Sequence, residues 1–303
     1  PLNLHLIVCA SAGNDTVEVE IRNLHDNITR ITKNGEIIYD AKENEGLYYG
    51  VLTDRSVLSF DRVYEFAEST PIERLREVFS PQVENNMRIA EEGLTGKYGV
   101  GIGTSIIAND HSVAAKIKAY AAAASEARMS GCTLPVITNS GSGNQGIAAS
   151  IPVIVYAREH GIGEERMFRA LALSNLLTIY QKTFIGRLSA FCGAVSAAAG
   201  SGGAITYLAG GTPDQIKMTL INALANVSGI VCDGAKASCG AKISAGLEAA
   251  IPGHYLAMDN KFYQPHTGIQ QSDIDQTITA VGRMAMEGMR DTDKVILKIM
   301  LGE

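Results

Sequence analysis

The stretch LSAFCGAVSAAAGSGGAITYLAGGTP, from Leu188 to Pro213, contains no charged residue. It consists mainly of Ala, Gly and Ser, and it lacks the density of Leu, Ile and Phe that drives insertion into a bilayer. A membrane span is therefore disfavoured. We expect a buried helix pair, broken at Gly200–Gly203, whose small side chains let neighbouring helices approach closely.

Helical patterns surround this stretch on both sides. Further helices are predicted over Asp110–Met129, Asn144–His160, Gly163–Tyr180, Pro213–Ala225, Ser238–Ala250 and Ser272–Met300, the last with a break near Asp291. Thr70-Pro71 and Ser80-Pro81 each place a hydroxyl cap before a proline, which is typical of a helix start. Most of the chain after Ser56 is therefore predicted to be helical.

The first part of the chain is predicted to form strands instead. Thr16–Ile21 alternates between polar and aliphatic residues, as a half-buried strand does. Asn34-Gly35 is a strong signal for a two-residue hairpin turn between Ile28–Thr32 and Glu36–Tyr39. Leu47–Leu52 could add an edge strand. The fold class predicted is α+β, with a small part of antiparallel strands before a large helical domain.

A Gly-rich run from Gly96 to Gly103 marks the expected domain boundary. The sequence thus predicts an α+β part over residues 1–95 and a helical catalytic domain over residues 96–303. Pro1 is followed at once by a strand-like alternation, without an initiator Met. We therefore expect that a segment of the same protein precedes Pro1.

Composition and charge exclude several classes of protein. The chain has 303 residues and a net charge of −6, which argues against a general role in binding nucleic acid. Five cysteines are too few for a disulfide scaffold, and their odd number disfavours a fully paired secreted protein. No signal peptide opens the chain. Free or metal-bound thiols in the cytoplasm are the expectation.

A loop rich in Gly and Ser leads into one of the predicted helices. Such a loop exposes backbone N–H groups that, with the helix dipole, suit an anion. No Lys follows in the P-loop position, so a substrate carboxylate is favoured over a phosphate. The alternative is a turn that merely caps a buried helix. The candidate substrate-binding residues are Thr138, Asn139, Ser140, Gly141, Ser142, Gly143, Asn144 and Gln145.

Three cysteines lie in distinctive settings. Cys192 occurs in Phe-Cys-Gly-Ala, while Cys232 and Cys239 are separated by six residues beside Gly234 and Gly240. That spacing matches no standard zinc motif. Three thiolates suit an iron–sulfur cluster that keeps one iron open for substrate. The alternative is that these cysteines are small buried apolar residues, which is the interpretation preferred for the other two cysteines.

The histidines give only a weak signal. None forms a metalloprotease or Cys–His catalytic motif, and a surface or structural role is the default for each. His25 follows a strand and precedes Asp26-Asn27, so we expect it at the end of the sheet, where sites often form. It is the weak candidate for a catalytic base.

The loop and cysteine motifs resemble those of a known family. Ser140–Gly146, Cys192-Gly-Ala and Cys232-Asp-Gly-Ala-Lys-x-Ser-Cys are similar to motifs of the serine dehydratase-like alpha family. The branch that the chain looks most like is the UPF0597 group, which includes L-cysteine desulfidases. The likeness extends through essentially the whole chain and includes Ala127–Pro135 and Gly288–Asp293.

The resemblance implies a lyase with an oxygen-sensitive [4Fe–4S] cluster. Its three cysteine ligands would correspond to Cys192, Cys232 and Cys239, with the open iron acting as a Lewis acid. The family also has an upstream region with a Cys-Thr-Glu-Pro motif that contributes to the active site. A segment before Pro1 would then be needed to complete the site, and a chain without it is expected to be inactive or free of the cluster.

The resulting hypothesis is α,β-elimination from a small amino acid, with L-cysteine as substrate and pyruvate, ammonia and sulfide as products. L-Serine dehydration by the same chemistry is the nearest alternative. A non-catalytic amino-acid or redox sensor is an alternative from another class. The Ala- and Gly-rich helices could pack within one chain or across a homodimer. No membrane or nucleic-acid partner is expected.

Overall fold

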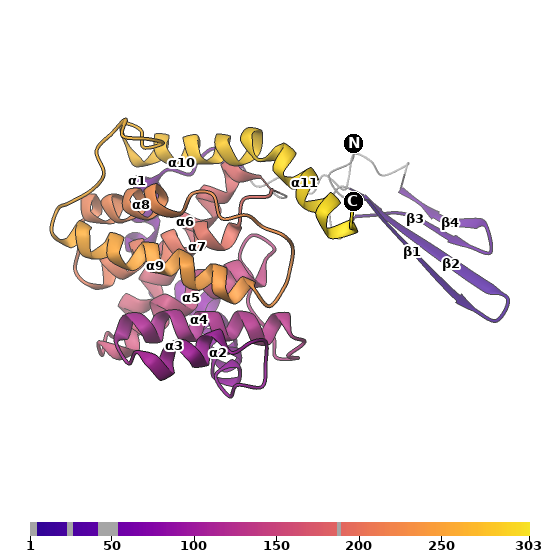
Figure 1. The fold of residues 1–303 in the computed structure, drawn as a ribbon, viewed down its shortest axis with the longest axis horizontal. Coiled ribbons are helices and arrows are strands. Elements are labelled where there is room, and N and C mark those ends of the chain that lie inside the picture. The colour runs from indigo at the N-terminus through magenta and orange to yellow at the C-terminus, as the bar shows by residue number, and fades with distance from the viewer. Residues whose placement is uncertain (1–4, 23–26, 42–53, 187–188) are drawn as a thin grey trace. The chain divides into compact units, whose positions relative to one another are not determined.

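The computed structural model describes residues 5–22, 27–41, 54–186 and 189–303. The chain forms two compact units, which divide between Ser56 and Val57. The first unit contains an antiparallel sheet and the second is helical (Figure 1). The predicted α+β class is therefore confirmed.

The sheet of the first unit is a simple meander. Its strands are β1 (His5–Ala12), β2 (Asp15–Arg22), β3 (Ile28–Lys33) and β4 (Glu36–Asp40), paired antiparallel in the order β1-β2-β3-β4. Asn34 and Gly35 join β3 to β4 with φ of 51° and 84°, the left-handed values of a type I′ turn. The predicted hairpin is thus confirmed. The predicted strand over Leu47–Leu52 lies outside the described residues.

A buried carboxylate ties three strands of this sheet together. The Glu20 side chain accepts hydrogen bonds from Arg22 Nε and from His5 Nε2, each at 2.7 Å, and pairs with Arg30 Nε at 3.4 Å. Burial raises the pKa of Glu20, but the bonds from Arg22 and His5 outweigh it and hold that pKa below its usual value. Glu20 is therefore a buried acid of β2 that stabilises the sheet through its charged partners.

The second unit is built from helices (Figure 1). They are α1 (Phe60–Ser69), α2 (Ile72–Gly93), α3 (Ile102–Asn109), α4 (Val113–Met129), α5 (Gly143–Glu159), α6 (Glu164–Ile185), α7 (Gly193–Leu208), α8 (Pro213–Val227), α9 (Cys239–Met258), α10 (Ile274–Arg283), the π-helical turn η2 (Met284–Gly288) and α11 (Arg290–Leu301). Because α1 packs on α6, and α2 on α4, α5 and α6, both belong to the helical unit. The division observed after Ser56 thus differs from the boundary predicted at residue 95.

Helix α7 is the centre of the helical unit. Every residue from Ala194 to Leu208 is buried, and α5, α6, α8 and α9 pack around it. The predicted break at Gly200–Gly203 is wrong, because the helix continues through it. A Cβ atom at Gly200 would lie 2.9 Å from the Ser174 carbonyl of α6, and one at Gly202 would lie 2.8 Å from the Ala250 Cβ of α9. These glycines allow close helix packing and do not end the helix.

One other predicted helix boundary is also wrong. Pro81 lies inside α2 and does not begin a helix. The buried face of α2 continues past it, from Phe79 to Asn86, and that burial outweighs the one backbone hydrogen bond that a proline removes. The last helix is interrupted near Asp291, as predicted: η2 is closed by a bond from Met289 N to Met284 O at 3.1 Å, and α11 begins at Arg290 with Asp291 in its first turn.

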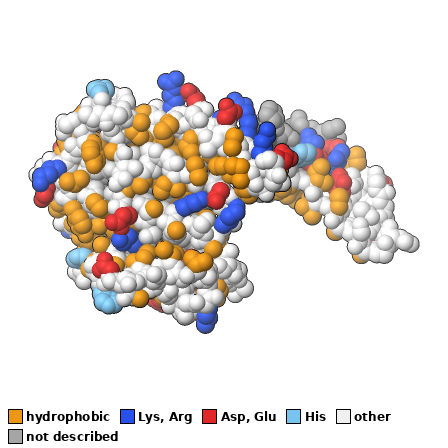
Figure 2. Space-filling view, viewed as in Figure 1, with side chains coloured by type: hydrophobic (Ala, Val, Ile, Leu, Met, Phe, Trp, Pro, Cys, Tyr) orange, Lys and Arg blue, Asp and Glu red, His pale blue; other side chains and the backbone are white. Residues whose placement is uncertain are grey.

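Among the described residues, no helix is long and apolar enough to cross a membrane. The uncharged stretch that includes α7 is covered by other helices instead. On the face drawn in Figure 2, apolar side chains are widely distributed, and basic and acidic side chains lie in small mixed groups over the helical unit.

Candidate active site

The Gly- and Ser-rich loop forms a tight hairpin before α5. Asn139 N donates to Ser142 O at 3.1 Å and Ser142 N donates back to Asn139 O at 2.9 Å. Ser140 and Gly141, with φ of 51° and 77°, fill the two turn positions. Ser142 is then the N-cap of α5 and accepts from Gln145 N at 3.4 Å. The loop therefore fixes the position of the α5 N-terminus.

A buried amide that the sequence analysis did not single out holds this hairpin against α5. The Asn86 side chain, on α2, accepts from Ile137 N and donates to Ser150 Oγ, both at 2.8 Å. A Cβ atom at Gly146 would overlap the Ile137 carbonyl, so only glycine permits this close approach. In the sequence, this role was indicated by a polar residue at a position where the helical periodicity of α2 places buried residues.

Arg128 lies directly against the α5 N-terminus. A Cβ atom at Gly143 would overlap the Arg128 guanidinium. No acidic side chain within the described ranges forms an ion pair with Arg128, and its guanidinium donates a weak bond from Nη1 to Met129 Sδ at 3.9 Å. A guanidinium and a helix N-terminus are both positive, and their proximity favours an anion between or beside them. This residue supports the anion site predicted from the loop.

The loops that carry Cys192 and Cys232 pair with each other. Phe191 and Val231 form an antiparallel bridge, flanked by bonds from Cys192 N to Ile230 O at 3.0 Å and from Cys232 N to Ala190 O at 2.6 Å. Because alternate residues of paired strands share a face, Cys192 and Cys232 project to the same side. Residues 40 positions apart in the sequence thus meet at a backbone junction.

Two of the three thiols also lie at helix N-termini. Cys192 is the N-cap of α7 and Cys239 is the first residue of α9, positions that favour a thiolate. Burial is the main reason that the pKa of the Cys192 thiol is raised, and the neighbouring thiols of Cys232 and Cys239 raise it further. The three predicted ligands therefore lie close enough to influence one another electrostatically.

The anion loop and the cysteine region adjoin. Gly193 follows Cys192, and a Cβ atom on it would lie 2.7 Å from the Gln145 side-chain amide. Gln145 therefore packs on the first turn of α7. One side chain links the α5 N-terminus to the thiols.

Several buried polar groups around this junction lack partners. Among the described residues, Gln145 Oε1, Gln181 Oε1 and Ser196 Oγ form no hydrogen bond, although buried polar atoms nearly always do. Gln181 Nε2 donates to Ser196 O at 3.0 Å, so these two lie together. Next to Gln181, Lys182 is only 8% exposed. The cluster is polar, buried and incomplete, as expected of a site that receives a ligand.

Two lysines add positive charge near the thiols. Burial lowers the pKa of Lys182, and Cys232 and Cys192 partly counteract this effect. Lys182 forms no ion pair with any described carboxylate. Burial also lowers the pKa of Lys242, but its ion pair with Asp233 more than offsets this and raises it. Lys182 was not predicted, since one lysine in a helical pattern carries no signal of burial.

The side chains and helix N-termini of this region are chemically suited to an anionic iron–sulfur cluster. Three thiols, two helix N-termini and two lysines gather in one region, and the charge of Lys182, which pairs with no carboxylate of the described residues, favours an anion there. The ligand geometry is not assembled, because in the described part of the chain no three His, Cys, Asp or Glu side chains are arranged to hold a metal ion. Residues 187 and 188, close by in sequence, are outside that part.

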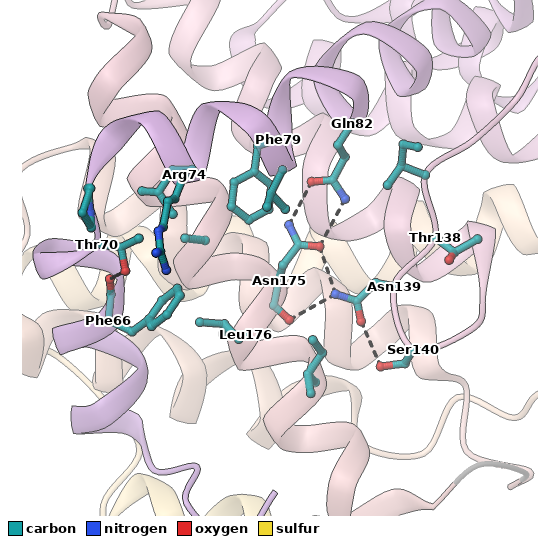
Figure 3. Close-up of a pocket in the computed structure, with 16 residues that line it drawn as sticks. Phe66, Thr70, Arg74, Phe79, Gln82, Thr138, Asn139, Ser140, Asn175 and Leu176 are labelled. Carbon is teal, nitrogen blue, oxygen red and sulfur yellow. Dashed lines mark hydrogen bonds between the residues drawn. The ribbon is translucent and has the colours of Figure 1, made fainter. Parts of the chain in front are cut away.

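The predicted substrate-binding residues divide between two regions. Gly143, Asn144 and Gln145 are buried in the first turn of α5, where Gln145 contacts Gly193 beside Cys192 and the Asn144 amide bonds Ser125 Oγ and Met129 Sδ of α4. Thr138, Asn139 and Ser140 instead line a cavity between α2 and α6 (Figure 3). The structure therefore does not gather all eight around one point.

The remaining cysteines and histidines lie elsewhere. His25 is outside the described residues. Cys9 is exposed on β1, whereas Cys132 is partly buried beside Tyr98. His254 is buried between helices and bonds Thr206 Oγ1 at 2.9 Å. The structure places none of these described side chains with the three thiols.

An N-terminal meander followed by this helical bundle defines an α+β protein with a thiol-rich site at helix N-termini. The chain belongs to the serine dehydratase alpha chain family, whose profile matches residues 17–298. This confirms the resemblance seen in the loop and cysteine motifs.

Curated relatives place it in the UPF0597 group. A UPF0597 protein of Treponema denticola is 46% identical over 99% of this chain and 71% of its own length. Those of Lachnoclostridium phytofermentans and Fusobacterium nucleatum are 48% and 44% identical over 98% and 99% of this chain, each over 71% of the relative. No solved structure matches the chain.

Proposed function

We propose that this protein is an iron–sulfur-dependent lyase that acts on a small L-α-amino acid, with L-cysteine as the substrate. The overall reaction converts L-cysteine and water to pyruvate, ammonia and hydrogen sulfide. The Cα–H and Cβ–S bonds break, aminoacrylate forms, and water hydrolyses its imine tautomer. No external oxidant or reductant is needed.

The observation that carries this proposal is the set of unpartnered polar groups between the α5 N-terminus and the start of α7. Gln145 Oε1 and Gln181 Oε1 are buried acceptors without donors, which suits the α-ammonium group of an amino acid. Arg128 and the α5 N-terminus are positive groups without an anion, which suits its carboxylate. Both halves of a zwitterion would therefore find partners.

Cys192, Cys232 and Cys239 would hold a [4Fe–4S] cluster, which when bound supplies a Lewis acid that stabilises negative charge on the leaving sulfur. The chain's own residues do the rest. Lys182 would balance the anionic charge of the thiolates, and the packing of Gln145 on Gly193 would orient the bound amino acid beside them.

L-Serine is the second candidate substrate, with hydroxide as the leaving group. The family description as serine dehydratase alpha chains supports it. Serine and cysteine share the ammonium and carboxylate groups that the unpartnered residues would recognise, so they differ only in the leaving atom. Turnover of the two substrates by the same preparation separates these candidates.

The test is anaerobic reconstitution of the protein, together with any segment that precedes Pro1, with iron and sulfide. We expect a visible cluster absorbance, and pyruvate and sulfide from L-cysteine. Cys232→Ala should abolish both, while Cys9→Ala on β1 should change neither. A protein that has neither cluster absorbance nor product from either amino acid would contradict the proposal, and ligand binding without turnover would indicate a sensor.

A further inference from the structure

The cavity lined by Thr138, Asn139 and Ser140 of the hairpin has a volume of about 540 Å³. Such a volume is typical of small-molecule sites. Its walls come from the end of α1, the first turns of α2, the hairpin and the middle of α6 (Figure 3). We propose that it binds a monocarboxylate with an aliphatic or aromatic body, as a site distinct from the one that holds the amino acid.

The polar side chains at one end of the cavity hydrogen-bond one another and need no partner from a ligand. Asn175 Nδ2 donates to Gln82 Oε1 at 3.0 Å, and Asn139 Nδ2 donates to Asn175 Oδ1 at 2.9 Å. Ser140 Oγ in turn donates to Asn139 Oδ1 at 2.9 Å. Because these amides satisfy one another, an apolar body can cover them without leaving them unpaired. Figure 3 shows this chain of bonds at one end of the cavity.

The middle of the cavity is apolar. Leu75 and Phe79 are buried at its wall, whereas Phe66 and Val78 keep 49% and 61% of their surfaces exposed. An aliphatic or aromatic ligand would remove this exposed apolar surface from water, which favours its binding. The apolar wall therefore indicates that the body of the ligand is aliphatic or aromatic.

Arg74 determines the charge of the ligand. It is the one charged residue among those that line the cavity. It is exposed, and among the described residues no side chain bonds or pairs with its guanidinium. In Figure 3, it lies with Thr70 and Phe66 at the end away from Asn139 and Ser140. Its neighbour Arg76 pairs with Glu164 at 3.1 Å. A carboxylate would give Arg74 a bidentate partner at the mouth.

The test is isothermal titration calorimetry of iron-free protein with octanoate and 4-phenylbutyrate, and with their neutral amides. We expect saturable binding of the two carboxylates and weaker binding of the amides. Arg74→Gln should weaken carboxylate binding about tenfold, as expected for the loss of a charge-assisted hydrogen bond. Val78→Glu, at an exposed position on the mouth, should weaken it by a similar factor. Arg76→Gln is the matched control and should bind as the unaltered protein does.

Several results would overturn this inference. One is the absence of saturable carboxylate binding, and another is equal loss in Arg74→Gln and Arg76→Gln. If sedimentation shows a dimer that Val78→Glu dissociates, the face is covered by a second copy and the inference also fails. Since the probes are not substrates and the protein carries no iron, the outcome does not depend on the lyase activity.

Discussion

At the scale of single residues, the site is defined by buried polar atoms and a buried lysine that have no partner among the described residues. Lys182, Gln181 and Ser196 lie within the packed helices, where an unpaired polar group costs about 1–3 kcal/mol and a charge more. A folded protein keeps such groups when a ligand uses them. None of the three is recognisable in the sequence, because each occupies an ordinary helical position.

Lys182→Met tests this argument directly. Removing an unpaired buried charge should leave the free energy of unfolding unchanged or raise it by about 1 kcal/mol, while cluster loading or turnover of the reconstituted protein is lost. Chemical denaturation and visible absorbance measure the two effects. Lys217→Met, at a lysine that pairs with Asp61, is the control and should change neither. A large loss of stability in Lys182→Met would show that Lys182 is paired.

Gly193→Ala tests the link between the thiols and the anion loop. The new Cβ would meet the Gln145 side chain, which can move, and not the backbone. We therefore expect a loss of stability of about 1 kcal/mol or less but a clear rise in KM. Gly288→Ala, whose Cβ has ordinary contact at 3.9 Å, should leave KM unchanged. An unaltered KM in Gly193→Ala would show that Gln145 does not orient the substrate.

At the scale of elements, α7 determines how the helical unit packs, because its small residues allow neighbouring helices to lie close to its backbone. A helix of small residues presents little side-chain bulk, so α6 and α9 come close to its backbone at Gly200 and Gly202. This close packing positions the N-termini of α5, α7 and α9 around the cysteine region. The site therefore depends on the glycines of α7 as much as on the residues that form it.

Gly200→Ala and Gly203→Ala should have different effects on stability. At Gly200, the new Cβ meets a backbone carbonyl at 2.9 Å, and overpacking of about 1–3 kcal/mol outweighs the gain in helix propensity of about 1 kcal/mol. At Gly203, the nearest atom is the Ile216 Cγ2 at 3.3 Å, a side chain that can shift, so stability should be unchanged or slightly higher. Denaturant midpoints compare the two variants, and equal losses would contradict this account.

His254 on α9 makes the stability of the packed helices depend on pH. Burial, with a smaller effect from His160, lowers the pKa of His254 from 6.5 to about 4. The unfolded chain therefore binds this proton more readily, and stability should fall by roughly 3 kcal/mol as the pH drops from about 6.5 to about 4. His254→Gln should flatten that part of the profile. An unchanged profile would show that another group titrates.

At the scale of the whole molecule, the chain consists of two units with separate sources of stability. The helical unit is held by small-residue packing around α7, whereas the sheet relies on the pairing of Glu20 with His5, Arg22 and Arg30. The candidate site lies entirely within the helical unit, as far as the described residues go. A substitution in one unit should therefore change the hydrogen exchange of that unit alone.

Glu20→Gln should destabilise the sheet by about 1 kcal/mol, because it removes the charge that pairs with the partly exposed side chains of His5, Arg22 and Arg30. Hydrogen exchange should accelerate in β1–β4 and stay unchanged in α7. Since the pKa of Glu20 is lowered on folding, its contribution should be present above about pH 4.5 and be lost as the pH falls. Glu36→Gln, at an exposed residue of β4, is the control. Faster exchange in α7 would show that the units are coupled.

The sequence by itself determined the α+β class, the Asn34-Gly35 hairpin, the loop at the α5 N-terminus and the family. These features depend on local chemistry, such as turn preferences, alternation and a run of small residues, and on motifs that remain contiguous in the chain. Helix boundaries at Gly200 and Pro81 were mispredicted, because a local rule for glycine or proline takes no account of what packs against it.

Only the tertiary structure decided which residues meet. It paired the loops of Cys192 and Cys232, placed Gln145 on Gly193, and buried Lys182 and Gln181 Oε1 without a partner among the described residues. It also separated Thr138 and Ser140 from the thiols and put them in a cavity with Arg74. Burial and proximity between distant segments arise from packing, so no property of an isolated stretch of this sequence could reveal them.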